Sequence, residues 1–162
     1  MTSANQSDPA VWTFRNIKGG SYNAGDFAGK VVLVVNTASH CGFTPQYSAL
    51  QHLQDTYGAS GLEVLAVPSD DFKQEEPDDA AVQDFCERNF GLTLKMTGMA
   101  QVTGPQAHPL YQWLAKEGFV PDWNFAKVLF DRHGRVAAHW TGDIEPLDSS
   151  VEAEIKRNLA AG

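Results

Sequence analysis

Cys41 is the residue of this sequence whose type and position best suit covalent chemistry. It follows the apolar run of residues 31–35, which predicts a buried strand, and it precedes Thr44-Pro45, which predict a helix start with Thr44 as the N-cap. Unpaired backbone N–H groups and the positive end of the helix dipole at such a turn stabilise a thiolate and lower the thiol pKa. The sequence therefore predicts a reactive Cys41, and the alternative is an inert buried cysteine.

A second cysteine is missing from the turn that Cys41 begins. In Cys41-Gly-Phe-Thr44, the threonine stands where a thioredoxin-type redox pair has its second thiol. Dithiol exchange within the turn is therefore excluded. A single thiolate is suited instead to nucleophilic attack on a substrate such as a peroxide oxygen.

The elements around Cys41 predict the framework that positions it. Strand, helix and strand over residues 30–36, 45–57 and 62–67 predict a parallel pair with a right-handed crossover. An α/β thioredoxin-like fold is expected, with a central mixed β-sheet flanked by helices on both faces. The remaining elements are predicted as a hairpin of residues 11–15 and 21–23, a polar acidic loop over 69–79, a helix over 80–89, a short strand over 92–96, a helix over 109–116, a hairpin of 126–130 and 135–140, and a helix over 148–160.

Composition limits the class of protein. A length of 162 residues predicts one domain over residues 1–162, with a flexible start over residues 1–9. The formal net charge of −8 argues against nucleic acid or an anionic membrane as partner. No secretion signal or stretch of transmembrane length is recognised, so a cytoplasmic protein is expected, in which two cysteines are free thiols or a transient redox pair.

Several segments together resemble the glutathione peroxidase family. Residues 36–47, Asn-Thr-Ala-Ser-His-Cys-Gly-Phe-Thr-Pro-Gln-Tyr, are similar to its peroxidatic motif. The resemblance extends in order from about Val11 to the last helix, and it rests on the segments 61–68, 74–77, 85–86, 109–111 and 123–127. A single landmark would be weak, but their order and spacing together are highly specific.

This resemblance implies roles for three residues. Cys41 matches the residue that attacks the peroxide and becomes a sulfenic acid, and Trp123 and Asn124 match two members of the family's polar tetrad. An indole N–H and an amide N–H are neutral donors that can stabilise a thiolate and align a peroxide oxygen. The alternative is a core tryptophan beside an asparagine in a turn.

A fourth site position departs from the family pattern. Asp71 stands where most members carry the tetrad glutamine. An ionised carboxylate cannot donate a hydrogen bond, and near Cys41 it would raise the thiol pKa. Asp71 is therefore expected to turn away, to be offset by a cation such as Lys127, to be protonated or to manage protons in another way; alternatively, Asp70 and Asp71 belong to a solvated acidic loop.

The resemblance also assigns a role to the second cysteine. Cys86 matches the resolving cysteine of the thioredoxin-dependent branch, which forms a disulfide with the oxidised Cys41. Because the two thiols lie on different elements, the helix carrying Cys86 is expected to unwind locally. The alternative is that Cys86 only packs beside Val82 and Phe85.

The expected function is that of a thiol peroxidase acting on hydrogen peroxide and small organic hydroperoxides. Thioredoxin is favoured over glutathione as reductant, because a resolving cysteine is present and no basic cluster is evident for an anionic tripeptide. No cofactor, metal, nucleic-acid or membrane partner is expected, and the short connection over residues 117–123 favours a monomer. Three alternatives stay open: a peroxide sensor using Cys41 and Cys86, a cysteine hydrolase, and a non-catalytic binding module.

Overall fold

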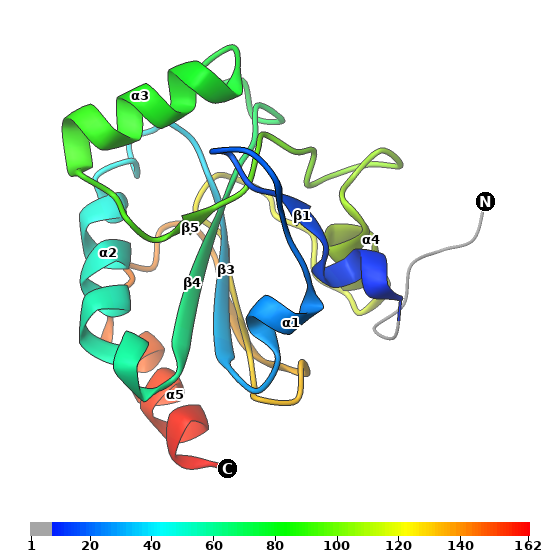
Figure 1. The fold of residues 1–162 in the computed structure, drawn as a ribbon, viewed down its shortest axis with the longest axis vertical. Helices are drawn as coiled ribbons and strands as arrows, with labels where there is room; N and C mark the ends of the chain where they lie inside the picture. Colours follow the sequence, from blue (N-terminus) through cyan, green and yellow to red (C-terminus); the bar gives the residue numbers. More distant parts are fainter. Residues whose placement is uncertain (1–7) are drawn as a thin grey trace.

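A five-stranded mixed sheet organises the computed structural model, which describes residues 8–162 (Figure 1). Its strand order is β5-β4-β3-β6-β7. The first three of these run parallel to one another, and β6 and β7 are antiparallel to their neighbours. The strands are β3 (Val31–Thr37), β4 (Leu62–Pro68), β5 (Lys95–Met96), β6 (Lys127–Phe130) and β7 (Val136–Trp140), and a separate hairpin joins β1 (Phe14–Arg15) to β2 (Ser21–Tyr22).

Helices cover both faces of the sheet. One face packs against α2 (Gln46–Tyr57) and α5 (Ser149–Ala160), and the other packs against α4 (Pro109–Lys116), α1 (Ala24–Phe27) and the 3₁₀ turn η1 (Pro9–Trp12). A second 3₁₀ turn, η2 (Gly58–Ser60), follows α2 directly. The helix α3 (Asp79–Phe90) lies across the end of the sheet at which β3 finishes (Figure 1). The loop that carries Cys41 leaves β3 at this end.

The two cores follow from the alternation of side chains along β3. Val31, Leu33 and Val35 are buried against α2 and α5, whereas Val32 and Val34 are buried on the opposite face. Because every residue of this strand is apolar up to Val35, both faces of its centre can be covered. A strand buried on both faces gives the loop after it a rigid base.

The predicted α/β thioredoxin-like architecture is confirmed, and the bounds of α4 match the prediction. The N-cap predicted at Thr44 is wrong, because α2 has Pro45 at its N-cap without a side-chain hydrogen bond. The Thr44 hydroxyl instead accepts from the backbone N–H of Cys41 at 3.0 Å and donates to the carbonyl of Ala38 at 2.8 Å. It therefore shapes the cysteine loop and does not cap the helix.

The start of the chain differs from the prediction. The strand expected over residues 11–15 is reduced to β1, because Pro9 begins the 3₁₀ turn η1 and the Asp8 carboxylate accepts from Ala10 N–H at 2.9 Å. The flexible start was predicted over residues 1–9, of which 1–7 lie outside the described residues, while Asp8 and Pro9 belong to this turn. In residues 8–162, no helix is long and apolar enough to cross a membrane.

Candidate active site

The loop after β3 gives the Cys41 sulfur one backbone hydrogen-bond donor. The N–H of Phe43 points to Cys41 Sγ at 3.3 Å, while the N–H of Cys41 itself is taken by Thr44 Oγ. The side chain is 9% exposed and belongs to the apolar cluster on the α2 face. A backbone N–H aimed at sulfur favours the thiolate. The donor expected at this turn therefore exists, and it comes from the loop itself.

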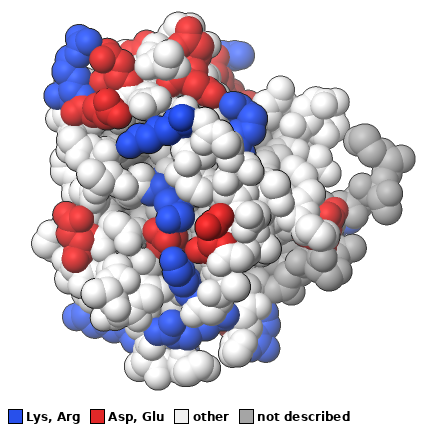
Figure 2. Space-filling view, viewed as in Figure 1, with Lys and Arg blue, Asp and Glu red and all other residues white. Residues whose placement is uncertain are grey.

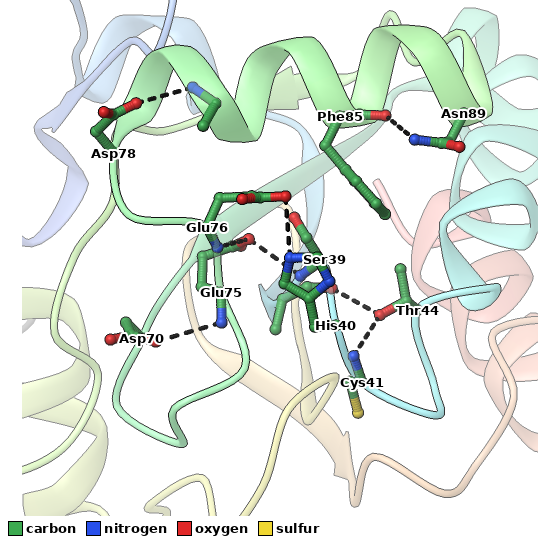
Figure 3. Close-up of polar contacts among 12 residues, drawn as sticks. Ser39, His40, Cys41, Thr44, Asp70, Glu75, Glu76, Asp78, Phe85 and Asn89 are labelled. Carbon is green, nitrogen blue, oxygen red and sulfur yellow. Dashed lines mark hydrogen bonds and ion pairs between the residues drawn. The ribbon is translucent and has the colours of Figure 1, made fainter.

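A second loop, residues 74–76, holds the cysteine loop from the side of α3. Ser39 N–H donates to Glu75 Oε1 at 3.0 Å, and His40 N–H donates to the Gln74 carbonyl at 2.8 Å. The His40 ring nitrogen lies 2.9 Å from Glu76 Oε1 (Figure 3). These contacts fix the residues directly before Cys41 to the segment that precedes α3.

His40 and Cys41 point in different directions. The His40 ring packs edge-on against Phe85 of α3, with ring centroids 5.7 Å apart. The Cys41 sulfur points away from α3 (Figure 3). Adjacent side chains on the turn thus diverge.

The end of β3 brings Trp123 beside the cysteine loop. Asn36 is fully buried there, and its side-chain amide donates to the Trp123 carbonyl at 2.9 Å. The Asn36 carbonyl in turn accepts from Phe125 N–H at 2.6 Å, and Phe125 has a φ of 66°. The indole is 38% exposed and packs against the Phe72 ring, with centroids 5.4 Å apart. Trp123 therefore lies at the surface of the site.

Asn124 is held in a different way. Its side chain is fully buried, and Nδ2 donates to Gln74 Oε1 at 3.0 Å. A β-carbon at Gly142 would lie 2.1 Å from the Asn124 carbonyl oxygen, so only glycine permits this approach. The expected donation to sulfur is not seen in residues 8–162, because the Asn124 amide is taken by Gln74 and the Trp123 indole makes no hydrogen bond with Cys41.

The Asp71 carboxylate binds a segment far from it in the sequence. Its Oδ2 accepts from Val102 N–H at 2.7 Å and from both the N–H and the hydroxyl of Thr103 at 3.0 Å. In residues 8–162, no hydrogen bond joins this carboxylate to Cys41, and the predicted alternatives for its role remain proposals. Three donors on a partly buried carboxylate make this side chain an anchor for the segment of residues 102–103.

Lys127 does not pair with Asp71, so the predicted offset is wrong. The lysine is fully buried, and Nζ donates to the Phe125 carbonyl at 2.7 Å and to the Gly142 carbonyl at 3.4 Å. Burial lowers the pKa of Lys127 to about 8, and the negative charges of Glu145 and Asp143 oppose this shift. Lys127 thus supports the backbone turn that carries Trp123 and Asn124.

Cys86 lies on α3 and is 3% exposed. Both cysteines are free, and both belong to the apolar cluster on the α2 face. Burial raises the pKa of the Cys86 thiol to about 11, with the Tyr47 side chain opposing the shift and Glu75 adding to it through its charge. Cys86 therefore packs as the structural alternative requires, and a bond to Cys41 needs a rearrangement because the Cys41 sulfur points away from α3 (Figure 3).

Two positioning residues had no role in the sequence analysis. Gln74 joins the backbone of His40 to the side chain of Asn124, and Asn36 holds the turn of residues 123–125. An asparagine at the end of an otherwise apolar strand was a usable signal for a buried hydrogen-bonding residue. Gln74 gave no such signal, because it lies in a polar loop. In residues 8–162, no group of three or more His, Cys, Asp or Glu side chains could hold a metal ion.

Comparison with known proteins agrees with this geometry. A family model described as glutathione peroxidase matches residues 11–115. A glutathione peroxidase of Lactococcus lactis is 42% identical over 150 residues, which cover 88% of this chain and 94% of that protein. The hydroperoxy fatty acid reductase gpx1 of Synechocystis is 40% identical over 80% of this chain and 83% of its own length. The crystal structure of Trgpx in apo form superposes with a TM-score of 0.71 at 30% identity, covering 93% of this chain and 95% of that one.

Proposed function

Because this chain belongs to the glutathione peroxidase family, we propose that Cys41 is the thiol that reduces hydrogen peroxide and small organic hydroperoxides. The family makes the protein a peroxidase, an oxidoreductase that acts on peroxides. The observation that carries the assignment of Cys41 is the N–H of Phe43 aimed at Cys41 Sγ at 3.3 Å, on a loop that residues 74–76 hold in place. Cys86 has no such donor and lies inside a helix.

In the proposed first step, the Cys41 thiolate attacks one peroxide oxygen and the O–O bond breaks. The sulfur keeps the attacked oxygen as a sulfenic acid, and the other oxygen leaves as water or an alcohol after taking a proton. The Phe43 N–H stabilises the thiolate before the attack. Trp123 is the member of the Trp123–Asn124 pair that meets solvent, so it is the donor proposed to contact the peroxide.

In the proposed second step, Cys86 attacks the sulfenic acid and water leaves, so that a Cys41–Cys86 disulfide forms. This step requires α3 to open, because Cys86 is buried and the Cys41 sulfur points away from α3. The start of α3 is tied down through Asp79, which accepts from the Arg15 side chain at 2.9 Å and from Met99 N–H at 2.8 Å. Opening is therefore proposed for the half of the helix that carries Cys86 and ends at Gly91.

Thioredoxin is the reductant we favour. Acidic and basic side chains both lie at the end of the molecule that carries α3 (Figure 2), but the side chains that adjoin the cysteine loop directly are those of Glu75 and Glu76. An anionic tripeptide such as glutathione would be repelled there. A protein reductant needs only an accessible disulfide, which the opening of α3 would provide. A cytoplasmic, monomeric protein remains the expectation that goes with this proposal.

Mass spectrometry after one equivalent of peroxide tests the proposal. The wild type should lose two hydrogens through a Cys41–Cys86 disulfide, and Cys86→Ser should retain an oxidised Cys41 after one stoichiometric reduction. Steady-state turnover with thioredoxin, thioredoxin reductase and NADPH then separates a peroxidase from a peroxide sensor, since a sensor turns over poorly. Peroxide consumption that persists in Cys41→Ser would contradict the assignment of the nucleophile.

A further inference from the structure

A groove lies at the end of the sheet opposite Cys41. It has a volume of about 1030 Å³, and it is formed by residues of α1, of the segment 28–30 and of the connection between β6 and β7. Val32 at the start of β3 lies in its wall, whereas Cys41 follows the other end of the same strand. The groove is therefore separate from the candidate active site, and the proposed peroxidase reaction gives it no use.

Aromatic side chains form the apolar part of this groove. The Trp12 ring packs against the Phe130 ring with centroids 4.9 Å apart, and against the Phe27 ring with centroids 5.4 Å apart. Phe130 and Phe27 are buried, and Trp12 is half-buried. Concave sites lined by aromatic side chains, with a few polar groups at the edge, are typical of binding sites for small organic molecules.

The charged side chains of the groove are mostly positive. Three cations line it, from Lys30, Arg132 and Arg135, against the single carboxylate of Asp131. Its formal charge is thus +2, in a chain whose formal net charge is −8. Lys and Arg side chains also gather at the end of the molecule opposite α3 (Figure 2). The groove is therefore complementary in charge to an anion.

The charge of Arg132 is fixed in position without being neutralised. Its Nη1 donates to the Gly29 carbonyl at 3.0 Å. Its Nη2 donates to the carbonyls of Ser60 and Leu159 at 3.1 and 3.0 Å. The ion pairs within residues 8–162 do not include Arg132. Neutral carbonyls hold the guanidinium in place, so it provides a permanent positive charge in the wall of the groove.

The other two cations are only partly balanced by carboxylates. Lys30 shares Glu63 with Lys95, at distances of 3.1 and 3.2 Å between Nζ and Oε1, so two ammonium groups face one carboxylate. Arg135 Nε lies 3.3 Å from Asp131 Oδ2, and the arginine side chain is 67% exposed. Exposed ion pairs are weak, so both side chains can turn to a bound anion at small cost.

We propose that this groove binds a small organic carboxylate with an apolar body. The apolar body lies against Trp12 and Phe27, and the carboxylate lies at the edge beside Lys30 and Arg135. Asp131 in the same wall disfavours a ligand with several negative charges. The inference goes beyond the peroxidase reaction and does not depend on it, because the groove and Cys41 lie at opposite ends of β3.

The test uses three probes that separate the charge from the apolar body. Octanoate carries both, 1-octanol has the same chain without the charge, and inorganic phosphate has charge without a chain. Backbone amide signals of residues 27–30 and 131–135 should shift when octanoate is added to the protein, and their titration gives the Kd. We expect 1-octanol to bind at least about threefold more weakly, and phosphate to shift none of these signals.

Charge-removing variants locate the carboxylate. Lys30→Gln combined with Arg135→Gln should weaken octanoate binding by about threefold to tenfold and leave 1-octanol binding unchanged. Lys18→Gln combined with Arg88→Gln is the matched control, because it removes the same charge from two exposed residues that do not line the groove. Ala28→Glu adds a negative charge to the groove wall at an exposed residue, and it should weaken octanoate binding more than 1-octanol binding.

Four results would overturn the inference. One is equal affinity for octanoate and 1-octanol, and another is an equal loss of octanoate binding in the two double variants. The third is a set of shifted signals that map to the Cys41 loop and leave residues 27–30 and 131–135 unchanged. The fourth is a dimer in sedimentation velocity that Ala28→Glu abolishes, since a second copy of the chain would then be the occupant. If the double variant at Lys30 and Arg135 does not fold, unchanged octanoate affinity in Ala28→Glu overturns the inference.

Discussion

Cys41 and Cys86 belong to the same apolar cluster, yet the groups around their two sulfurs differ in almost every respect. Cys41 lies on a loop, and its sulfur receives the backbone N–H of Phe43. Cys86 lies inside α3, where its own turn of helix uses the backbone N–H groups, and burial raises its thiol pKa to about 11. The Cys41 sulfur thus has a backbone donor, whereas burial disfavours charge on the Cys86 sulfur.

This difference indicates that apolar contact alone does not decide the chemistry of a cysteine. A loop can aim a free N–H at a sulfur, whereas a helix interior has no such group to spare. The loop of Cys41 is held by residues 74–76 from one side, whereas α3 is held by hydrogen bonds of Asp79 at its start and by ring packing of Phe85 and Phe90 further along. The arrangement therefore separates a fixed reaction centre from a thiol that has to move to take part.

Replacing each cysteine by serine should give the largest change in the rate of peroxide reduction. Cys41→Ser should lower the rate of peroxide reduction by about 10³-fold or more, because the nucleophile is removed. Cys86→Ser should leave the first reduction within about twofold and abolish repeated turnover with thioredoxin. Stopped-flow measurement of one turnover and of the steady state checks both. Equal loss of the first turnover in the two variants would contradict the difference between the two sulfurs.

A smaller effect on the rate is expected from substituting Gln74, whose contacts support the loop that carries Cys41. Gln74→Ala leaves the buried amide of Asn124 without its acceptor, at a cost of about 1–3 kcal/mol. Oxidation of Cys41 should slow by about tenfold, since the turn that carries Trp123 loses its hold on the cysteine loop. Gln83→Ala, on the exposed side of α3 with a side chain bonded to Glu87, is the control and should react like the wild type. An unchanged rate in Gln74→Ala would show that Asn124 needs no support.

The fold could be predicted largely because its strongest signals are local. The apolar run at the start of β3 and the largely apolar β4 each dictate a strand, and the apolar spacing of α2 with the glycines at its end dictates a helix. The wrong predictions concern polar side chains that can form hydrogen bonds in two different local structures. Thr44 has the composition of an N-cap, but the loop takes its hydroxyl, and Asp8-Pro9 starts a 3₁₀ turn where a strand was expected.

The sequence proposes the residues of the site, but it could not predict their contacts. Asn36 at the end of β3 binds Trp123, the acceptor of the Asn124 amide is Gln74, and Lys127 supports the turn below and not Asp71. Each of these contacts depends on how loops far apart in the sequence meet, which local patterns do not encode.

Substitution of Asp71 tests whether the acidic loop takes part in the reaction of Cys41. In Asp71→Asn, Val102 and Thr103 lose charge-assisted hydrogen bonds, so the free energy of unfolding should fall by about 2 kcal/mol. Oxidation of Cys41 should change less than about twofold, because the carboxylate binds Val102 and Thr103. Urea unfolding and one-turnover kinetics measure the two effects. A large loss of rate without loss of stability would instead give Asp71 an active part in the reaction.

The smallest effect is expected in how the free energy of unfolding depends on pH through Lys127. Because burial lowers the pKa of Lys127 to about 8, the folded protein releases this proton at a lower pH than the unfolded chain does. The unfolded state then binds more protons above pH 8, so the contribution of Lys127 to stability rises with pH. Between pH 7 and 8.5 the gain should be on the order of 1 kcal/mol relative to Lys127→Met.

The pH range of the measurement matters because the contribution of Cys86 to stability changes with pH in the opposite direction to that of Lys127. Its thiol pKa is raised from 9.0 to about 11, so the unfolded chain loses this proton first and the contribution of Cys86 falls above pH 9. Urea midpoints measured at and below pH 8.5 therefore isolate the lysine. Lys156→Met, a charge removed from the exposed side of α5, should keep the wild-type pH dependence. If Lys127→Met also keeps the wild-type pH dependence, the pKa of Lys127 is not lowered in the folded protein. The turn carrying Trp123 and Asn124 is then supported by a charged lysine and not by one that is close to neutral.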